Sequence, residues 1–207
     1  MDSIIFDLDG TLWNSTKTLA GPWVKTLNKY GIKKTITASD LEAVMGKTVE
    51  QIAETFMSDI DEDTRNKIAY EACDAEIPEL KKQGGILYPD LEDTLKELSK
   101  TYKLFIVSNC EDAYINAFFD FHGLKKYFTD AEYIGRTGKE KSENIKIIIE
   151  RHSLKSPVYV GDTHMDEDAA KKNSLPFIFA SYGLGKSENY DLKLDRISDL
   201  PELLKNL

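Results

Sequence analysis

The chain has 207 residues, of which 41% are hydrophobic and 30% charged, and its formal net charge is −9 at neutral pH. This composition predicts a folded protein with one sizeable core, or a core and a small accessory domain, and it excludes a disordered chain. The acidic balance argues against a broad nucleic-acid-binding surface but is compatible with a small anionic substrate. No apolar stretch approaches the roughly 20 residues that span a bilayer, and two cysteines provide no disulfide framework. We expect no signal peptide, because the first predicted strand begins almost at once. We therefore expect a cytoplasmic protein.

The most informative segment lies near the start, where the apolar run 4–6 leads directly into two aspartates. A short apolar run of this kind predicts a buried strand. In an extended chain Asp7 and Asp9 point the same way, and two crowded carboxylates repel unless a cation or a shared proton compensates. Gly10 permits a tight turn, and Thr11 adds a hydroxyl donor. An acidic turn after a strand is the plainer interpretation, but the pattern also predicts a Mg²⁺ site.

Residues 15 to 83 have helical periodicity and almost no strand-like runs. Four helices are expected: one over 18–30 that ends at Gly31, a short one over 41–45 that is capped by Ser39 and ends at Gly46, one that begins at Thr48 and includes Phe56, and one that begins at Asp61 or Asp63 and runs to Leu80. They predict an all-helical insertion of about 70 residues, large enough for a minor domain.

From Gly85 onward, apolar runs alternate with amphipathic stretches. Strands are expected at 104–107, 127–134, 158–160 and 176–180, and helices near 91–98, 113–121, 142–149, 166–172 and 200–204. Alternation of this kind predicts an α/β fold with right-handed crossovers and a parallel sheet that is covered by helices on both faces.

Polar side chains follow three of the predicted strands. Asp7 and Asp9 follow the first, Ser108 and Asn109 follow the run 104–107, and Asp162 follows the run 158–160. Ligands of open α/β sheets bind beyond the carboxyl ends of the strands. Complementary chemistry at three separate strand ends therefore predicts a functional site.

With these residues in view, the chain resembles the haloacid dehalogenase superfamily, and specifically its phosphoglycolate-phosphatase-like hydrolases with a helical cap. Four motifs carry the resemblance in the family's order: Asp7-Leu-Asp9-Gly10-Thr11, then Val-Ser108-Asn109, then a lysine before the helix 142–152, and finally Gly161-Asp162-Thr-His-Met-Asp166. The resemblance implies a three-layer Rossmann-like core from residues 1–14 and 87–207. It also implies that residues 15–86, here called the helical insertion, form a cap domain.

The resemblance further implies roles for the acidic residues. Asp7 would attack phosphorus and form an aspartyl-phosphate, and Asp9 would act as general acid and then general base. Mg²⁺ would lie between Asp7, the main-chain carbonyl of Asp9 and Asp162. Asp166 would lie beside the metal, as a ligand or by orienting a metal-bound water.

The remaining implied roles concern phosphate and substrate. Ser108 and Asn109 would hold phosphoryl oxygens, and a lysine would neutralise charge that Mg²⁺ leaves uncompensated. Lys139 and Lys141 both precede the helix; Lys141 is preferred because it lies at the helix start. Lys47 falls where relatives place a substrate-specificity loop, although a solvated loop lysine is the commoner interpretation.

The function that these features imply is Mg²⁺-dependent hydrolysis of a small phosphorylated metabolite, either phosphoglycolate-like or a sugar phosphate. A phosphomutase would share the nucleophile, metal and cap. A non-catalytic phosphate-binding or regulatory protein on the same fold is the alternative of another class. Closure of one cap over one core requires no second chain, so a monomer or a weak homodimer is expected.

Overall fold

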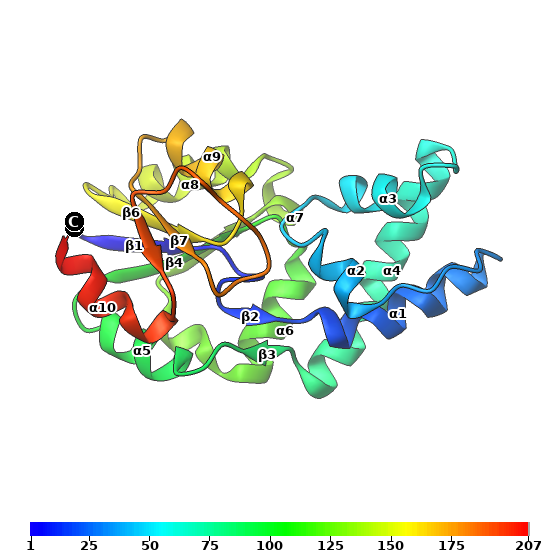
Figure 1. Cartoon of the computed structure of the whole chain (residues 1–207), viewed down its shortest axis with the longest axis horizontal. Coiled ribbons are helices and arrows are strands. Elements are labelled where there is room, and N and C mark those ends of the chain that lie inside the picture. Colours follow the sequence, from blue (N-terminus) through cyan, green and yellow to red (C-terminus); the bar gives the residue numbers. More distant parts are fainter. Residues whose placement is uncertain (207) are drawn as a thin grey trace.

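The computed structural model describes residues 1–206, and a six-stranded parallel sheet forms the centre of one of its two lobes (Figure 1). The strand order is β5 (Asp130–Tyr133), β4 (Lys103–Ser108), β1 (Ser3–Phe6), β6 (Pro157–Gly161), β7 (Phe177–Ala180) and β8 (Leu192–Leu194). All five neighbouring pairs run parallel. The predicted α/β class with a parallel Rossmann-like sheet is therefore confirmed.

The sheet is buried because its central strands are apolar on both faces. In β1 the side chain of Ile5 packs with α8 (Lys141–His152) and α9 (His164–Lys172) on one face. Ile4 and Phe6 belong to the opposite apolar cluster, which includes side chains of α5 (Leu91–Leu98), α6 (Asp112–His122) and α10 (Leu200–Leu203). Successive residues of a strand point to opposite faces, so an uninterrupted apolar run is what a strand between two helical layers requires.

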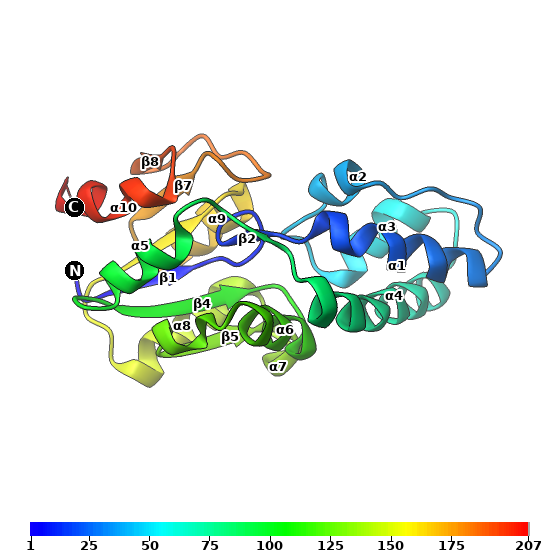
Figure 2. The same ribbon diagram turned by 90° about the horizontal axis from the view of Figure 1, so that it is seen from below.

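The helical insertion lies beyond one end of the sheet (Figures 1 and 2). It contains α1 (Thr16–Lys29), α2 (Ala38–Glu42), α3 (Val49–Met57) and α4 (Glu62–Gln83). Its two connections to the sheet contain β2 (Trp13–Asn14) and β3 (Ile86–Leu87), which pair antiparallel. The apolar cluster on the α6 face of the sheet continues without a break into this insertion, where it includes Trp23 and Phe56. The insertion is thus packed on the core as well as tethered to it.

Local signals decide where the insertion's helices begin. Thr48 caps α3 with a reciprocal Gln51 contact, as expected, and of the two candidates for α4 it is Asp61 that accepts the Thr64 N–H. The prediction for α2 was wrong at its start, because Thr37 rather than Ser39 forms the capping box, with Asp40. The helix therefore begins three residues earlier than expected.

Several short elements were not expected from the sequence. These are β2, β3, β8, the helix α7 (Ile134–Thr137) and the 3₁₀ turns Leu124–Tyr127, Ile197–Asp199 and Leu204–Asn206. The short strand expected within 127–134 is β5, and the first residue of that range belongs to the Leu124–Tyr127 turn. Across residues 1–206, none of the helices has the length and apolar character to cross a membrane.

Candidate active site

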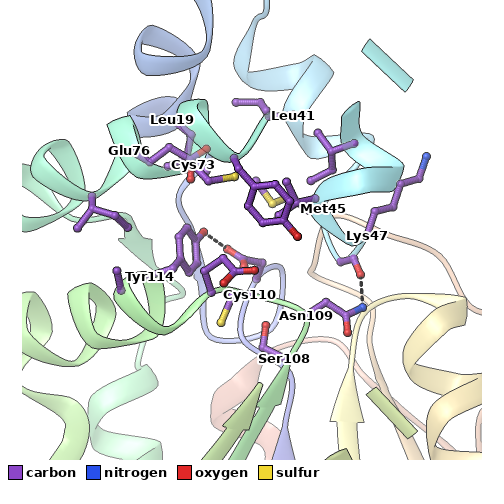
Figure 3. A pocket seen from close by; sticks show the side chains of 18 of the residues that line it. Leu19, Leu41, Met45, Lys47, Cys73, Glu76, Ser108, Asn109, Cys110 and Tyr114 are labelled. Atoms are coloured by element: carbon purple, nitrogen blue, oxygen red, sulfur yellow. Dashed lines mark hydrogen bonds between the residues drawn. The ribbon is translucent and has the colours of Figure 1, made fainter. Parts of the chain in front are cut away.

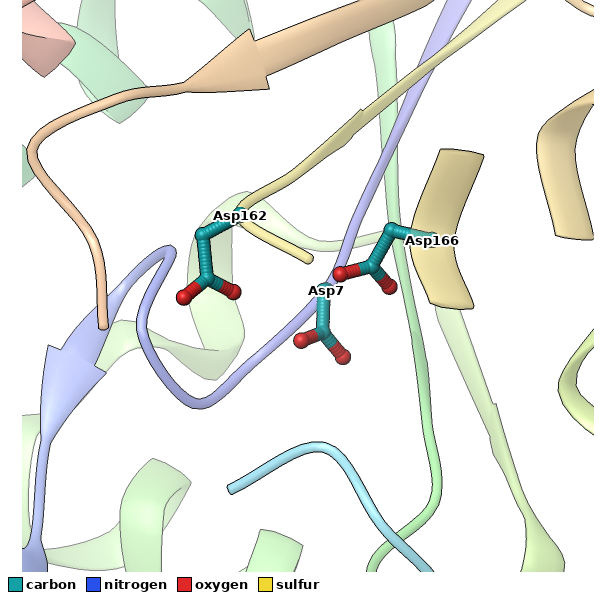
Figure 4. A group of neighbouring side chains, drawn as sticks. All are labelled: Asp7, Asp162 and Asp166. Atoms are coloured by element: carbon teal, nitrogen blue, oxygen red, sulfur yellow. The ribbon is translucent and has the colours of Figure 1, made fainter. Parts of the chain in front are cut away.

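Three buried aspartates meet at the carboxyl ends of the central strands (Figure 4). β1 lies between β4 and β6, so the residues that follow these strands become neighbours in space. Asp7 follows β1, Asp162 follows β6, and Asp166 comes from the first turn of α9. One carboxylate oxygen of each lies within 4.8 Å of the others. Ser108, the last residue of β4, is buried beside them at the same edge of the sheet.

The turn after Asp9 is what lets two of these segments approach. Gly10 has φ +78°, and a Cβ atom on it would lie 2.1 Å from Asp162 Oδ2. A Cβ atom on Gly183 would lie 2.4 Å from the Gly10 carbonyl oxygen. Only glycine fits where the backbone is both left-handed and this crowded. Gly10 is therefore required by the geometry of the site itself.

Lys141 occupies the centre of the acidic cluster. Its Nζ donates to Asp7 Oδ1 at 2.9 Å and to Asp166 Oδ1 at 2.6 Å, and the side chain is buried. Burial acts to lower the pKa of Lys141, but the Asp166 and Asp7 carboxylates outweigh it and raise that pKa above its usual value. Lys139 is exposed. Of the two candidate lysines, the structure brings Lys141 to the aspartates.

The donor set fits a divalent cation. Within residues 1–206, no hydrogen-bond partner reaches the buried atoms Asp7 Oδ2 and Asp162 Oδ1. Asp162 Oδ2 accepts main-chain N–H bonds from Leu184 and Gly185, which fix the orientation of the carboxylate. Burial and then Asp166 raise the pKa of Asp7 well above its usual value and that of Asp162 to about 7. Three carboxylates face one lysine, and unpartnered carboxylate oxygens are the ligands that Mg²⁺ prefers.

Asp166 differs from the other two aspartates because both its oxygens are engaged. Oδ1 accepts from Lys141 Nζ, and also from Tyr159 Oη at 3.3 Å. Oδ2 accepts from the Thr163 N–H at 3.0 Å and the Thr163 hydroxyl at 2.7 Å, which completes the capping box of α9. This arrangement favours Asp166 as a group that orients Lys141 and water over Asp166 as a direct metal ligand.

Asp9 lies on the other side of Asp7, in a separate hydrogen-bond network. Its Oδ1 accepts from the Tyr114 hydroxyl at 2.6 Å and from the Ser15 hydroxyl at 3.2 Å, and those two hydroxyl oxygens are 2.6 Å apart. Burial raises the pKa of Asp9, and the bonds from Tyr114 and Ser15 act against that rise. Sequence reasoning missed Tyr114 and Ser15. The only available signal was a phenol on the apolar side of a helix, which by itself predicts packing.

The loop between α2 and α3 reaches the core beside Asn109. Asn109 Nδ2 donates to the Gly46 carbonyl oxygen at 2.8 Å, and Asn109 Oδ1 is buried without a partner among the described residues. Lys47 follows in the same loop, but its Nζ donates to the Thr55 hydroxyl at 3.3 Å. Figure 3 shows the Lys47 amine pointing away from Ser108 and Tyr114. The loop therefore lies over the site while its lysine does not enter it.

A cavity of about 330 Å³ separates the helical insertion from the strand ends (Figure 3). Asp7, Asp9 and Ser108 line its floor, and the insertion supplies much of its wall. The arrangement brings together two buried carboxylates on the cavity floor, the buried ammonium of Lys141 and unpartnered carboxylate oxygens that suit a metal ion. Such a combination is typical of enzymes that transfer a charged group.

The chain belongs to the haloacid dehalogenase-like hydrolase family, whose family model matches residues 4–180. Its curated relatives include phosphoglycolate phosphatases of Vibrio parahaemolyticus (28% identity over 97% of this chain and 95% of that protein) and Aquifex aeolicus (29% identity over 100% and 98%). Together with the family match, they make this chain an enzyme of the phosphatase type. The fold is shared with the crystal structure of "a predicted phosphatase from Clostridium acetobutylicum", at 24% identity and a TM-score of 0.82, over 100% of this chain and 99% of that one. The resemblance inferred from the motifs is confirmed.

Proposed function

We propose that this phosphatase hydrolyses a small phosphate monoester in two steps through an aspartyl-phosphate on Asp7, with Mg²⁺ as cofactor. The observation that best supports this is the pair of unpartnered, buried oxygens on Asp7 and Asp162 beside the buried ammonium of Lys141. Phosphoryl transfer needs little covalent help from a protein, but it needs positive charge held in place around the phosphoryl oxygens. Mg²⁺ bound by Asp7, the Asp9 carbonyl and Asp162 would supply that charge together with Lys141.

In the first step a carboxylate oxygen of Asp7 attacks phosphorus, and the bond from phosphorus to the alcohol oxygen breaks. Asp9 in its acid form gives a proton to the departing alkoxide. The rise that burial causes in the pKa of Asp9 favours that acid form. Lys141, Ser108 and the main-chain donors near Asn109 would bind the phosphoryl oxygens during transfer.

In the second step Asp9, now a carboxylate, takes a proton from water. The resulting hydroxide attacks phosphorus, the bond from phosphorus to Asp7 breaks, and inorganic phosphate leaves. Tyr114 and Ser15 orient the Asp9 carboxylate in both steps, since both hydroxyls contact its Oδ1. The free carboxylate of Asp7 and the acid form of Asp9 are restored.

The substrate must fit a cavity of about 330 Å³, which supports a small metabolite, either phosphoglycolate-like or a sugar phosphate. The helical insertion, residues 15–86, would act as the cap that closes over it. We also propose that the protein works in the cytoplasm as a monomer or weak dimer, with no nucleic-acid partner. Size-exclusion chromatography with light scattering would test the oligomeric state.

The first experiment is phosphate release from a panel of phosphorylated metabolites and from p-nitrophenyl phosphate, with Mg²⁺ and with a chelator. Metal-dependent release from one or two compounds would support the proposal, and Asp7→Asn protein supplies the background rate. Interconversion of sugar phosphates without release would favour a mutase. No reaction with any compound would favour a phosphate-binding role and overturn the hydrolase proposal.

A further inference from the structure

The lining of the cavity over the strand ends has more acidic than basic residues. Besides Asp7 and Asp9, the acidic residues along its lining are Asp74, Glu76, Glu111 and Asp112. Among the described residues that line it, Lys47 is the single basic one, and its amine is bonded to Thr55. At the floor, where the phosphoryl group would bind, Lys141 and a bound Mg²⁺ would compensate charge. Neither would compensate the acidic residues of the upper cavity.

The rest of the upper wall is largely apolar. The residues that give it this character are Leu19, Trp23, Leu41, Met45, Ile52 and Ile77. They come from α1, from the α2–α3 region and from α4, so the whole helical insertion contributes to the surface. A surface of this kind binds the carbon skeleton of a ligand and offers nothing to an anion.

Glu76 is the one acidic side chain of the upper wall that is fully buried. It projects from α4, is 4% exposed, and accepts a hydrogen bond from Trp23 Nε1 on its Oε1 at 2.5 Å. Among the described residues nothing donates to its second oxygen, and no basic residue pairs with it. Because Glu76 lines the cavity, this second oxygen is the polar group through which it could meet a ligand. The mechanism proposed above does not use this group.

We propose that the natural substrate is a phosphate monoester of a non-anionic alcohol, whose carbon skeleton packs on the apolar wall and whose hydroxyl or amine donates a hydrogen bond to Glu76. The inference rests on the phosphatase function proposed above and narrows its substrate class. It disfavours phosphoglycolate itself, because the carboxylate of glycolate would face the apolar wall and the acidic residues Asp74, Glu111 and Asp112. Like charges placed opposite each other discriminate between ligands more sharply than small differences in shape.

The test is a matched set of esters that differ only at the end remote from phosphate. With a two-carbon skeleton these are phosphoglycolate, 2-hydroxyethyl phosphate and O-phosphoethanolamine, and a five-carbon set with the same three end groups probes deeper into the cavity. We expect kcat/KM for the hydroxyl or amine ester to exceed that of the carboxylate ester by about thirtyfold or more in at least one set. A carboxylate ester that is equal or better in both sets would overturn the inference while leaving the phosphatase proposal intact. Failure to hydrolyse any ester, p-nitrophenyl phosphate included, would overturn both.

A substitution tests whether Glu76 causes the preference against the carboxylate ester. Burial raises the pKa of Glu76 to about 8, so this comparison is made at pH 9, where the wild-type side chain is charged. Glu76→Gln then removes the charge but keeps an amide oxygen that can accept from Trp23, so we expect discrimination against the carboxylate ester to fall about tenfold, mainly through KM. Glu79→Gln, one turn later on α4 and outside the cavity, is the matched control and should keep the wild-type preference. Unchanged discrimination in Glu76→Gln would overturn the assignment of this residue.

Discussion

Replacing Lys141 with methionine should damage stability and catalysis together, because this one ammonium serves both. Its Nζ lies 2.9 Å from Asp7 Oδ1 and 2.6 Å from Asp166 Oδ1, in a site where all three side chains are nearly inaccessible. Methionine fills a similar volume but carries no charge. Lys141→Met would therefore leave two carboxylates facing each other without a cation.

The expected loss of stability follows from that geometry. Removing one partner of a buried ion pair costs about 3–5 kcal/mol, because the remaining charge stays desolvated. In a chain of this size the melting temperature would fall by roughly 10 °C. Mg²⁺ should recover part of the loss by neutralising Asp7. The rate should fall about a thousandfold, as when a preorganised electrostatic group is removed from a transition state.

The assay is urea unfolding with and without Mg²⁺, together with kcat on p-nitrophenyl phosphate. Lys139→Met is the matched control and should behave like the wild type, since Lys139 is exposed two residues away. The double variant Asp7→Asn/Lys141→Met should be more stable than Lys141→Met alone, because one uncompensated charge is gone. If the Lys141 and Lys139 variants were equally stable and active, the role given to Lys141 would be refuted.

Three further predictions concern the other groups at the site. Asp7→Asn should lower turnover by about a thousandfold or more, since the amide cannot form the intermediate, and near-wild-type phosphate release would contradict the mechanism. Tyr114→Phe removes a hydrogen bond that holds the pKa of Asp9 down. Asp9 must be in its acid form for the first step, so the alkaline limb of the pH profile of kcat/KM should move to higher pH, and an unshifted profile would count against this role of Tyr114. Burial raises the pKa of Glu76 from 4.5 to about 8, so the stability contributed by the neutral acid is complete below pH 4.5 and lost as the pH rises through 8. Between pH 5 and pH 9 the wild type should thus lose roughly 3 kcal/mol relative to Glu76→Gln in urea unfolding, whereas parallel pH curves would show that Glu76 titrates normally.

Most of the fold could be predicted from the sequence because its signals are local. The run Ile4–Phe6 is apolar on both faces, which only a strand between two helical layers tolerates, and β1 proved to be such a strand. Thr48 and Asp61 cap their helices through contacts three residues away. The elements that escaped prediction are short or paired at long range. β2 and β3 are two residues each and exist because Trp13–Asn14 meets Ile86–Leu87 across the whole insertion.

The aspartates of the site could be placed together because parallel topology carries strand ends to one edge. That argument needs only that the runs before Asp7, Ser108 and Asp162 be neighbouring parallel strands. The argument from strand ends does not predict side chains that reach the site from helices, such as Tyr114 of α6. Tyr114 reaches Asp9 across 105 positions of sequence, and no periodicity or motif encodes such a contact.

Long-range packing, which no local sequence pattern encodes, also explains why the sequence suggested a functional role for Lys47 and none for Glu76. A lysine in a loop after glycine looks available for an anion, whereas a glutamate within a 22-residue helix looks like a solvated surface group. Packing reverses both interpretations, because Lys47 bonds to Thr55 and Glu76 is buried beside Trp23 over the catalytic floor. The groups that we propose as catalytic lie at strand ends, so the motifs reveal them. The groups that we propose to select the leaving alcohol lie on the insertion, where the packing of its helices, α1 against α4 above all, decides which side chains face the cavity. The reaction type can therefore be predicted from the sequence, whereas the preference among phosphate esters depends on the charge and shape of that cavity.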